Sequence, residues 1–487
     1  MKERLQRIDK VIAAGPFRDN WESLSRFTIP SWFREAKFGI FVHWGVFTVP
    51  EHANEWYPRS MYTEGLPEFE HHVKTYGPQS EFGYKDFIPL FTAEKFDPEE
   101  WAELFAASGA KYYVQVAEHH DGFQMYRSGI SRYNAYDMGP HRDVLGEMKR
   151  AIEKRGLVFG ASSHRAEHWF FLGHGKNFDS DIKEPLERGD LYWPSMPEGE
   201  FTDVRSEPYP SVEFLEDWLV RTCEIINRYQ PALLYFDWWI QHEAFRPYLT
   251  KMAAYYYSSA ATRGQAVAIA YKHDAMMFGT GIVDMERGQF ADPKPFSFQT
   301  DTAVARNSWC YTDSLEYKSV NEILYALIDI VSKNGCLLLN VGPRADGSIA
   351  PRDRDILESI GRWMSVNGSA IYGSRVWKTS AEGPTRVKEG HFSEETIAYT
   401  SEDMRFTVTG GSINVFVLRY PEDGRLLIRS LAGPGDHNKA AFSGIISGVS
   451  IPGFDEIPSW KQTHEGLLVE TRSVKSDLPV VVRVEVK

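Results

Sequence analysis

Between about residues 35 and 375, short apolar runs alternate with amphipathic stretches along the chain. The runs are rich in β-branched and aromatic residues, which is typical of buried strands. Strands and helices that alternate in this way predict a parallel α/β architecture. The seven predicted strands are Phe38 to Trp44, Tyr112 to Glu118, Leu157 to Ser162, Ala232 to Asp237, Ala266 to Tyr271, Gly281 to Glu286 and Cys336 to Val341.

Helix signals occupy several of the segments between these runs. Asp97 and Pro98 form an N-cap and first-turn pair, and we expect their helix to end near Gly109. A second helix is expected from about His141 to the stop signal at Gly156. A third carries apolar residues at spacings of three and four, at Val212, Leu215, Leu219, Cys223 and Ile226.

Seven strands, with an eighth expected in the poorly patterned region 51–95, predict a (β/α)₈-like TIM barrel. A doubly wound sheet is the competing topology. However, no GxGxxG follows any strand and no GxxxxGK[ST] occurs, so nucleotide binding has no support.

The pattern changes after a helix predicted from Pro351 to Val366. From about residue 376 strict alternation replaces helical periodicity, as in Ser412 to Leu418 and Val482 to Lys487, with Gly410-Gly411 as one of the intervening turn signals. We therefore predict a catalytic barrel over residues 1–375 and a C-terminal antiparallel β-sandwich over 376–487.

Charge and composition exclude several classes of partner. The formal net charge of −13 argues against a nucleic-acid partner, and no apolar run approaches the roughly 18 to 20 residues that would span a membrane. Three cysteines are too few for a disulfide framework. The first twenty residues lack a continuous apolar stretch, so we expect a cytoplasmic protein, although a secreted or periplasmic form whose signal had been removed would look the same.

Polar residues follow the predicted strands, where a barrel places its functional groups. They include His43-Trp44, Glu55-Trp56, Glu118-His119-His120-Asp121, His164-Arg165, Asp237-Trp238-Trp239, Lys272-His273, Glu286-Arg287 and Asn340. Asp237 is the most informative, because a carboxylate directly after a fully apolar run costs several kcal/mol unless it is partnered. The strand ends therefore predict an active site.

Two kinds of chemistry fit these residues. The histidines and Asp237 could bind Zn²⁺ or Mn²⁺ in a hydrolase or isomerase. Alternatively, two carboxyl groups could hydrolyse a glycoside whose ring stacks on tryptophan. The aromatic content of 14% favours the sugar, since Trp44, Trp56, Trp238 and Trp239 all adjoin the predicted site.

Six motifs together resemble α-L-fucosidases of glycoside hydrolase family 29 over about residues 30 to 377. They are Phe38-Gly-Ile-Phe-Val-His-Trp-Gly45, Glu55-Trp-Tyr57, His119-His-Asp-Gly-Phe123, the run from Leu234 to Trp239, Leu338-Leu-Asn-Val-Gly-Pro343 with Asp346-Gly347, and Asn367-Gly-Ser-Ala-Ile-Tyr-Gly373. The resemblance implies retaining hydrolysis of terminal α-L-fucosides on an oligosaccharide or glycoconjugate. It implies no metal and no other cofactor.

The resemblance also implies roles for individual residues. Asp237 matches the nucleophile that forms a covalent fucosyl-enzyme. The positions that match the family's fucose-binding residues are His43, Glu55, Trp56, His119 and His120. We add further substrate-binding candidates from the predicted strand ends, namely His164, Trp44, Trp238 and Arg287.

The acid/base is less directly indicated. Many family members place a Glu after an aromatic residue, where this chain has Phe298-Gln299, and glutamine cannot donate the proton. Glu286 is the best candidate, with Asp284 and Asp301 as alternatives. A metal-dependent barrel hydrolase or isomerase and an inactive sugar-binding homologue remain the competing functions. The sequence specifies neither the linkage nor the oligomeric state, and it is compatible with a homo-oligomer.

Overall fold

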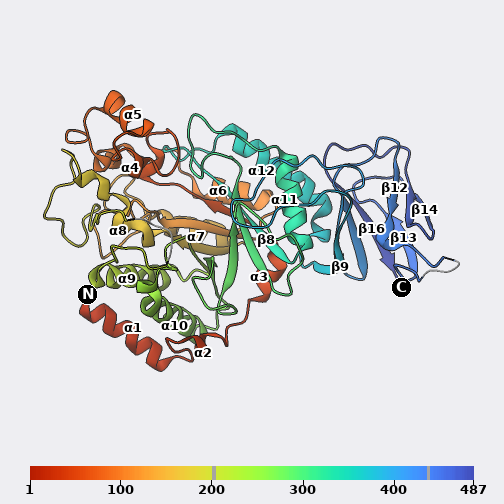
Figure 1. Cartoon of the computed structure of the whole chain (residues 1–487), viewed down its shortest axis with the longest axis horizontal. Coiled ribbons are helices and arrows are strands. Elements are labelled where there is room, and N and C mark those ends of the chain that lie inside the picture. Colours follow the sequence, from red (N-terminus) through yellow and green to blue (C-terminus); the bar gives the residue numbers. More distant parts are fainter. Residues whose placement is uncertain (200–203, 436–438) are drawn as a thin grey trace.

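The computed structural model describes residues 1–199, 204–435 and 439–487, and its larger part is a closed barrel of eight parallel strands (Figure 1). Each strand pairs with the next along the chain, and the last pairs with the first. The predicted (β/α)₈-like barrel is confirmed. The strands are β1 Phe38–Val42, β2 Tyr112–Glu118, β3 Val158–Ser163, β4 Leu233–Phe236, β5 Ala268–Lys272, β6 Ile282–Glu286, β7 Phe298–Ala303 and β8 Gly335–Val341.

The seven strands predicted from apolar runs are present, but the eighth was wrongly placed. Region 51–95 forms the short helices α4 (Tyr57–Ser60) and α5 (Pro67–Tyr76) and a 3₁₀ segment, and the missing strand is β7. Only Phe298 and Ala303 of β7 are apolar, although the whole strand is buried. Gln299 and Asp301 bind the buried polar groups Asp284 and Lys272, and Thr302 bonds to Glu394. The strand therefore does not read as an apolar run.

Helices cover most of the outside of the barrel. Asp97 caps α6 by accepting hydrogen bonds from the N–H groups of Glu99 and Glu100, as the sequence predicted. The N-terminal helix packs against α9 and α10 at one end of the molecule (Figure 1). The remaining helices are α1 Lys2–Ala14, α2 Trp21–Leu24, α3 Ser31–Ala36, α6 Pro98–Ala107, α7 Val144–Lys154, α8 His168–Phe171, α9 Val212–Tyr229, α10 Arg246–Thr262, α11 Val320–Ser332 and α12 Pro351–Asn367.

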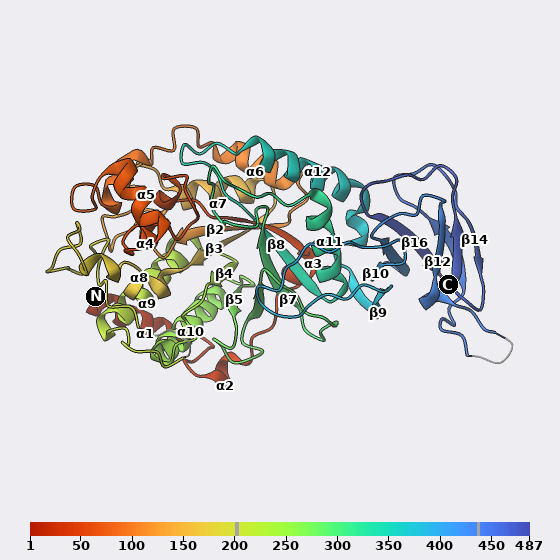
Figure 2. The ribbon, with the colours of Figure 1, turned by 45° about the horizontal axis from the view of Figure 1, so that its top comes forward.

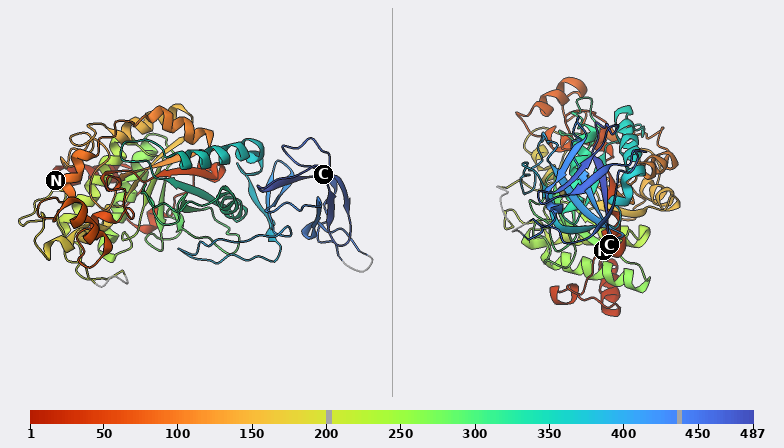
Figure 3. Two further views of the ribbon diagram at one scale, coloured as in Figure 1. Left: turned by 90° about the horizontal axis from the view of Figure 1, so that it is seen from above. Right: turned by 90° about the vertical axis from the view of Figure 1, so that its right-hand side faces the viewer.

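Two connections of the barrel depart from the regular pattern. Residues 273–281 join β5 to β6, and residues 287–297 join β6 to β7, both without a helix. The connection between β9 and β10, residues 383–403, runs back along this side of the barrel (Figures 2 and 3). Gly390 forms an isolated bridge with Gln289 there. A segment from beyond the barrel therefore lies where a barrel helix would normally pack.

The C-terminal region forms two antiparallel sheets, which confirms the predicted β-sandwich. One sheet has the order β13-β16-β11-β10-β9 and the other β12-β15-β14. In β16, Val482 and Val484 are buried while Glu485 is exposed, as alternation requires. The predicted boundary at residues 375 and 376 stays a prediction. The strands are β9 Arg375–Glu382, β10 Met404–Thr409, β11 Ser412–Val417, β12 Arg425–Ile428, β13 Ile446–Ser450, β14 Ser459–Gln462, β15 Leu467–Glu470 and β16 Val480–Val486.

The sandwich is joined to the barrel by apolar packing and by a buried ion pair. Phe416 and Val481 belong to the same apolar cluster as the helices α11 and α12. Arg405 of β10 donates to Asp329 of α11 at 2.6 Å, and both side chains are almost fully buried. Lys333 is the second cation on this carboxylate. In the described ranges, no helix is long and apolar enough to cross a membrane.

We expect Arg405→Ala to lower the free energy of unfolding by about 3 to 5 kcal/mol, because removing one member of a buried ion pair leaves the other desolvated charge under-compensated. Urea titration followed by tryptophan fluorescence measures the loss. Arg425→Ala is the matched control, because Arg425 pairs with Glu470 on the surface of the same domain and exposed pairs contribute only about 0 to 1 kcal/mol. Equal effects of the two substitutions would contradict the prediction.

Candidate active site

A cavity of about 210 Å³ opens at the carboxyl ends of the barrel strands. This is the end at which TIM barrels carry their functional groups. Its wall contains ten of the residues that the sequence singled out, and those ten come from several separate strands and loops. They are His43, Glu55, Trp56, His119, His120, His164, Asp237, Trp238, Glu286 and Asp301.

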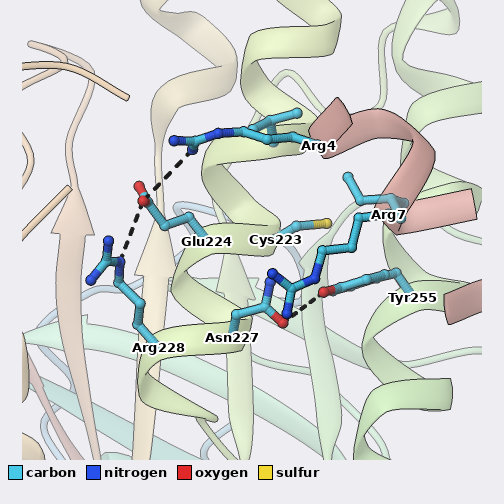
Figure 4. Close-up of a pocket in the computed structure, with 9 residues that line it drawn as sticks. Arg4, Arg7, Cys223, Glu224, Asn227, Arg228 and Tyr255 are labelled. Carbon is cyan, nitrogen blue, oxygen red and sulfur yellow. Dashed lines mark hydrogen bonds and ion pairs between the residues drawn. The ribbon is translucent and has the colours of Figure 1, made fainter. Parts of the chain in front are cut away.

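A larger hollow of about 370 Å³ lies elsewhere, between α1 and the barrel helices α9 and α10 (Figure 4). Arg4 and Arg228 both approach Glu224 there, and the Tyr255 hydroxyl donates to Asn227. Because this hollow is formed by the outer helices, it contains no residue from a strand end. The smaller cavity is therefore the candidate active site.

Asp237 directly follows β4 and is bound by two histidines. His164 Nδ1 lies 2.9 Å from Asp237 Oδ2, and His120 Nε2 lies 3.5 Å from the same oxygen. Burial raises the pKa of the carboxyl group, but these two histidines outweigh it and hold the pKa of Asp237 well below its usual value. Asp237 is consequently a carboxylate near neutral pH.

Glu286 ends β6 and has the opposite protonation behaviour. Burial raises the pKa of Glu286 to about 7; Lys272 opposes the rise, and the charges of Asp237 and Asp301 add to it. The Trp238 indole N–H donates to Glu286 Oε2 at 2.6 Å, and Lys272 Nζ lies 3.1 Å from that oxygen. Asp237 and Glu286 therefore differ in charge: Asp237 is ionised, and Glu286 keeps its proton up to about neutral pH.

Lys272 of β5 is the buried cation beneath this pair. Its Nζ lies 2.9 Å from Asp284 Oδ1 and 3.1 Å from Asp301 Oδ1. Asp284 is fully buried, accepts from the Gln299 amide at 2.7 Å and does not line the cavity. Asp301 lines the cavity and accepts from the Tyr235 hydroxyl at 2.9 Å. Of the three acid/base candidates, Glu286 and Asp301 thus reach the cavity.

The histidines differ in charge. Burial lowers the pKa of His43, His119 and His164, so their rings are neutral near pH 7. Burial also opposes the charge of His120, but the carboxylates of Glu167 and Asp237 outweigh it and raise the pKa of His120 to about 9. The His120 imidazolium therefore faces the Asp237 carboxylate.

The neutral rings are oriented by other polar groups. His43 Nδ1 lies 2.7 Å from Asn340 Oδ1, and His164 Nε2 lies 2.9 Å from the Ser162 hydroxyl. Among the described residues, the buried Nδ1 atom of His119 has no hydrogen-bond partner. An unpaired nitrogen beside a cavity is suited to a ligand hydroxyl, because buried polar groups otherwise find partners.

Glu55 and Trp56 lie on the loop after β1. Glu55 Oε2 accepts from the backbone N–H of Trp309 at 2.8 Å, and burial raises the pKa of Glu55. Trp56 packs against His120 and Phe171, with ring centroids 5.7 and 5.6 Å apart. An acid and an aromatic ring therefore form one fixed side of the cavity.

Two predicted substrate-binding residues lie outside the cavity, which corrects the sequence analysis. Trp44 is fully buried against Phe91 and Trp101, and its indole N–H donates to a backbone carbonyl. Arg287 stacks on Trp309 and donates to the backbone oxygen of Ala305. Each directly follows a cavity residue but lies just past a strand, at a position where its place in the sequence does not decide which way its side chain points.

The adjacent residues His119 and His120 both line the cavity, although neighbours on a regular strand point to opposite faces. They follow the end of β2 at Glu118, where the pairing with β3 shifts register, so simple alternation does not govern them.

Sequence reasoning assigned no site role to four other residues of the cavity wall. They are Glu167, Tyr235, Trp309 and Phe392. Glu167 and Trp309 adjoin segments that had been singled out, and Tyr235 reads as part of an apolar strand. Phe392 comes from the connection between β9 and β10, and nothing in the sequence places that connection beside the barrel.

The histidine cluster was also tested as a metal site. Ligand atoms of His43, His119 and His164 lie within 4.8 Å of one another, and His120, His164 and Asp237 form a second such group. His164 belongs to both groups, but its two ring nitrogens are engaged by Ser162 and Asp237. A metal ligated by His164 would have to displace one of these hydrogen bonds, so the donor set fits a metal poorly.

Comparison with known proteins identifies the family. The sequence profile of the family described as Alpha-L-fucosidase matches residues 5–369. The chain is 31% identical over 427 residues to the tissue alpha-L-fucosidase of Rattus norvegicus, covering 86% of this chain and 82% of the relative. The corresponding human protein is 30% identical over 422 residues, with 85% and 81% covered.

Solved structures agree. The Thermotoga maritima alpha-fucosidase matches with a TM-score of 0.74 at 28% identity, covering 96% of this chain and all of that chain. Its complex with a mechanism-based inhibitor matches with a TM-score of 0.75 at 28% identity, with 96% and 99% covered. The resemblance found in the sequence is confirmed, and the chain belongs to the alpha-L-fucosidase family of glycoside hydrolases.

Proposed function

We propose that Asp237 and Glu286 carry out the retaining hydrolysis of terminal α-L-fucosides by this chain, as nucleophile and acid/base. The main support is that Asp237 and Glu286 line one cavity at the strand ends and have pKa values displaced in opposite directions. A retaining glycosidase needs this pair, one member ionised to attack the sugar and the other protonated to release the leaving group.

In the first step, Glu286 donates its proton to the glycosidic oxygen while Asp237 Oδ attacks the anomeric carbon. The bond from that carbon to the glycosidic oxygen breaks, the leaving group departs as an alcohol, and a fucosyl ester of Asp237 remains. The new Glu286 carboxylate is stabilised by the Lys272 ammonium and the Trp238 N–H. The proton given up is therefore replaced by charge-assisted hydrogen bonds.

In the second step, the Glu286 carboxylate removes a proton from water, and the water oxygen attacks the anomeric carbon. The ester bond breaks, which restores the Asp237 carboxylate and releases fucose with its configuration retained. The proton is back on Glu286 at the end of the cycle. His120 and His164 again stabilise the Asp237 carboxylate through the contacts described above.

The cavity also supports the assignment of an exo-acting enzyme. Its volume of about 210 Å³ lies below the roughly 300 to 1,000 Å³ of sites for drug-sized ligands, so it suits a single terminal sugar. We propose that His43, His119 and Glu55 bind the hydroxyl groups, while Trp56 contacts apolar atoms of the ring. The substrate would be a fucosylated oligosaccharide or glycoconjugate, with neither nucleic acid nor membrane as a partner.

Replacing the nucleophile should nearly abolish turnover. We expect Asp237→Ala to reduce kcat/KM for p-nitrophenyl α-L-fucoside by about 10⁴-fold or more, which is typical for loss of a nucleophile. Added azide should restore p-nitrophenol release and yield β-L-fucosyl azide. Azide would attack the anomeric carbon in a single displacement from the face that Asp237 had occupied, and this inverts the configuration. Circular dichroism controls for folding, and undiminished turnover by a folded variant would refute the assignment.

Replacing the acid should discriminate between leaving groups. We expect Glu286→Ala to slow a natural fucosyl disaccharide by about 10² to 10⁴-fold, the usual worth of general acid catalysis, and to slow p-nitrophenyl fucoside far less in the first step. Azide should here yield α-L-fucosyl azide by attack on the fucosyl ester. Asp301→Asn is the matched comparison, and the α-azide appearing with Asp301→Asn instead would transfer the role to Asp301.

The pH profile follows from the two pKa displacements. The pKa of Glu286 is about 7 and the proton is needed in the first step, so kcat/KM for a disaccharide should fall as pH rises above about 7. Asp237 stays ionised at acidic pH, so the acidic limb of the profile should lie far below pH 7. In Glu286→Gln the limb near pH 7 should disappear, and its persistence would assign that limb to another group.

A further inference from the structure

Phe392 combines two unusual properties at the edge of the cavity. Its side chain is 60% exposed, although it is a large apolar group, and it also lines the cavity wall. Its backbone has φ of 55°, in the left-handed region that bulky residues avoid. Unfavourable backbone conformations persist where the surrounding structure imposes them, and they are concentrated at functional sites.

Backbone hydrogen bonds impose this conformation. The Phe392 N–H donates to the carbonyl oxygen of Glu286 at 2.8 Å, and the Glu286 N–H donates to His391 Nδ1 at 3.0 Å. On either side, Gly390 N–H donates to Gln289 O and Glu394 N–H donates to Arg287 O. Residues 390–394 are therefore fixed directly to the end of β6, which carries the acid/base.

The same contacts place an aromatic wall beside Glu286. The Trp238 indole N–H donates to the Glu286 carboxyl group. The centroid of the Trp238 ring lies 5.0 Å from that of His391 and 6.1 Å from that of Phe392. The Trp238 and Phe392 rings are nearly parallel, with 19° between their planes. A group of aromatic rings therefore lies next to the Glu286 carboxyl group, and its Phe392 ring is mostly exposed to solvent.

The chemistry of the first step determines what can lie against this wall. Glu286 must reach the glycosidic oxygen, and that oxygen joins fucose to the leaving group. Whatever is attached to fucose therefore lies beside Glu286 and outside the inner cavity. The exposed groups next to Glu286 at this point are aromatic, and aromatic faces stack on the C–H face of a sugar ring.

We propose that Phe392, together with Trp238, binds the first sugar ring of the leaving group and so contributes to linkage and leaving-group preference. This inference rests on the proposed function of Asp237 and Glu286. The segment is held by backbone groups and by the side chains of His391 and Glu394, and the Phe392 ring itself is mostly exposed. The ring is therefore not required to keep the segment in place.

The test compares substrates that differ only in the leaving group. Phe392→Ala should lower kcat/KM for a fucosyl disaccharide by about 2- to 12-fold, the range expected for loss of one aromatic stacking contact. Turnover of α-L-fucosyl fluoride should be unchanged, because fluoride has no ring to stack. Phe392→Gly should behave as Phe392→Ala does while removing the backbone strain, and Phe392→Tyr should retain disaccharide turnover.

Phe278→Ala is the matched control, since Phe278 is 61% exposed on the connection between β5 and β6 and does not line the cavity. It should change neither substrate. Equal losses on fluoride and disaccharide in Phe392→Ala, or no loss on either, would overturn the role of Phe392 while leaving the proposed function intact. If the unmodified protein hydrolyses neither substrate, the proposed function fails, and this inference fails with it.

Discussion

A single ammonium group governs the electrostatics of the barrel mouth. Lys272 is the buried cation for three carboxyl groups at once, Asp284, Glu286 and Asp301, and Asp237 lies close enough to interact with it. One positive charge cannot compensate all of these groups in a region that excludes water. The shortage is relieved by protonation, so the pKa of Asp301 and the pKa of Glu286 both rise. Two carboxyl groups can therefore differ in charge although they share one cavity.

The His120 imidazolium completes this balance. It stabilises the Asp237 carboxylate, while Glu167 on its other side helps it to keep its proton. The reaction needs an ionised Asp237, and Lys272 alone could not stabilise that charge beside its other three carboxyl groups. Acid and nucleophile are thus distinguished by their neighbours rather than by their chemical type, which is the general way in which one site accommodates two carboxyl roles.

Much of this arrangement could be predicted from the sequence, for identifiable reasons. Seven strands are apolar runs, and the residues at their ends, such as His43, Asp237 and Glu286, are the ones that line the cavity. β7 was missed because four of its six residues are polar although the whole strand is buried, which a reading of apolar runs does not detect. Trp44 was misplaced because its closeness in sequence to His43 does not decide where its side chain points, and its ring packs against Phe91 and Trp101 instead.

Contacts between distant segments could not be predicted in this way. Trp309 meets Glu55 across more than 250 residues, and Phe392 reaches Glu286 from beyond the last barrel helix. Nothing in the local pattern of residues 383–403 indicates that they return to the barrel. They fit beside the barrel because the connections from β5 to β6 and from β6 to β7 have no helix. This absence becomes evident only in the complete fold.

This returning segment has a consequence for how the enzyme can diverge. The inner chamber is composed of strand-end residues whose side chains are mutually bound, so a change at one disturbs several others. The outer wall is attached largely through main-chain groups that most amino acids provide, together with the side chains of His391 and Glu394. Side chains at its tip are therefore free to be exchanged at little cost to folding, and selectivity toward different glycans can evolve there while the bond-breaking apparatus stays constant. A barrel separated from its C-terminal sandwich would lose that adjustable surface along with the domain.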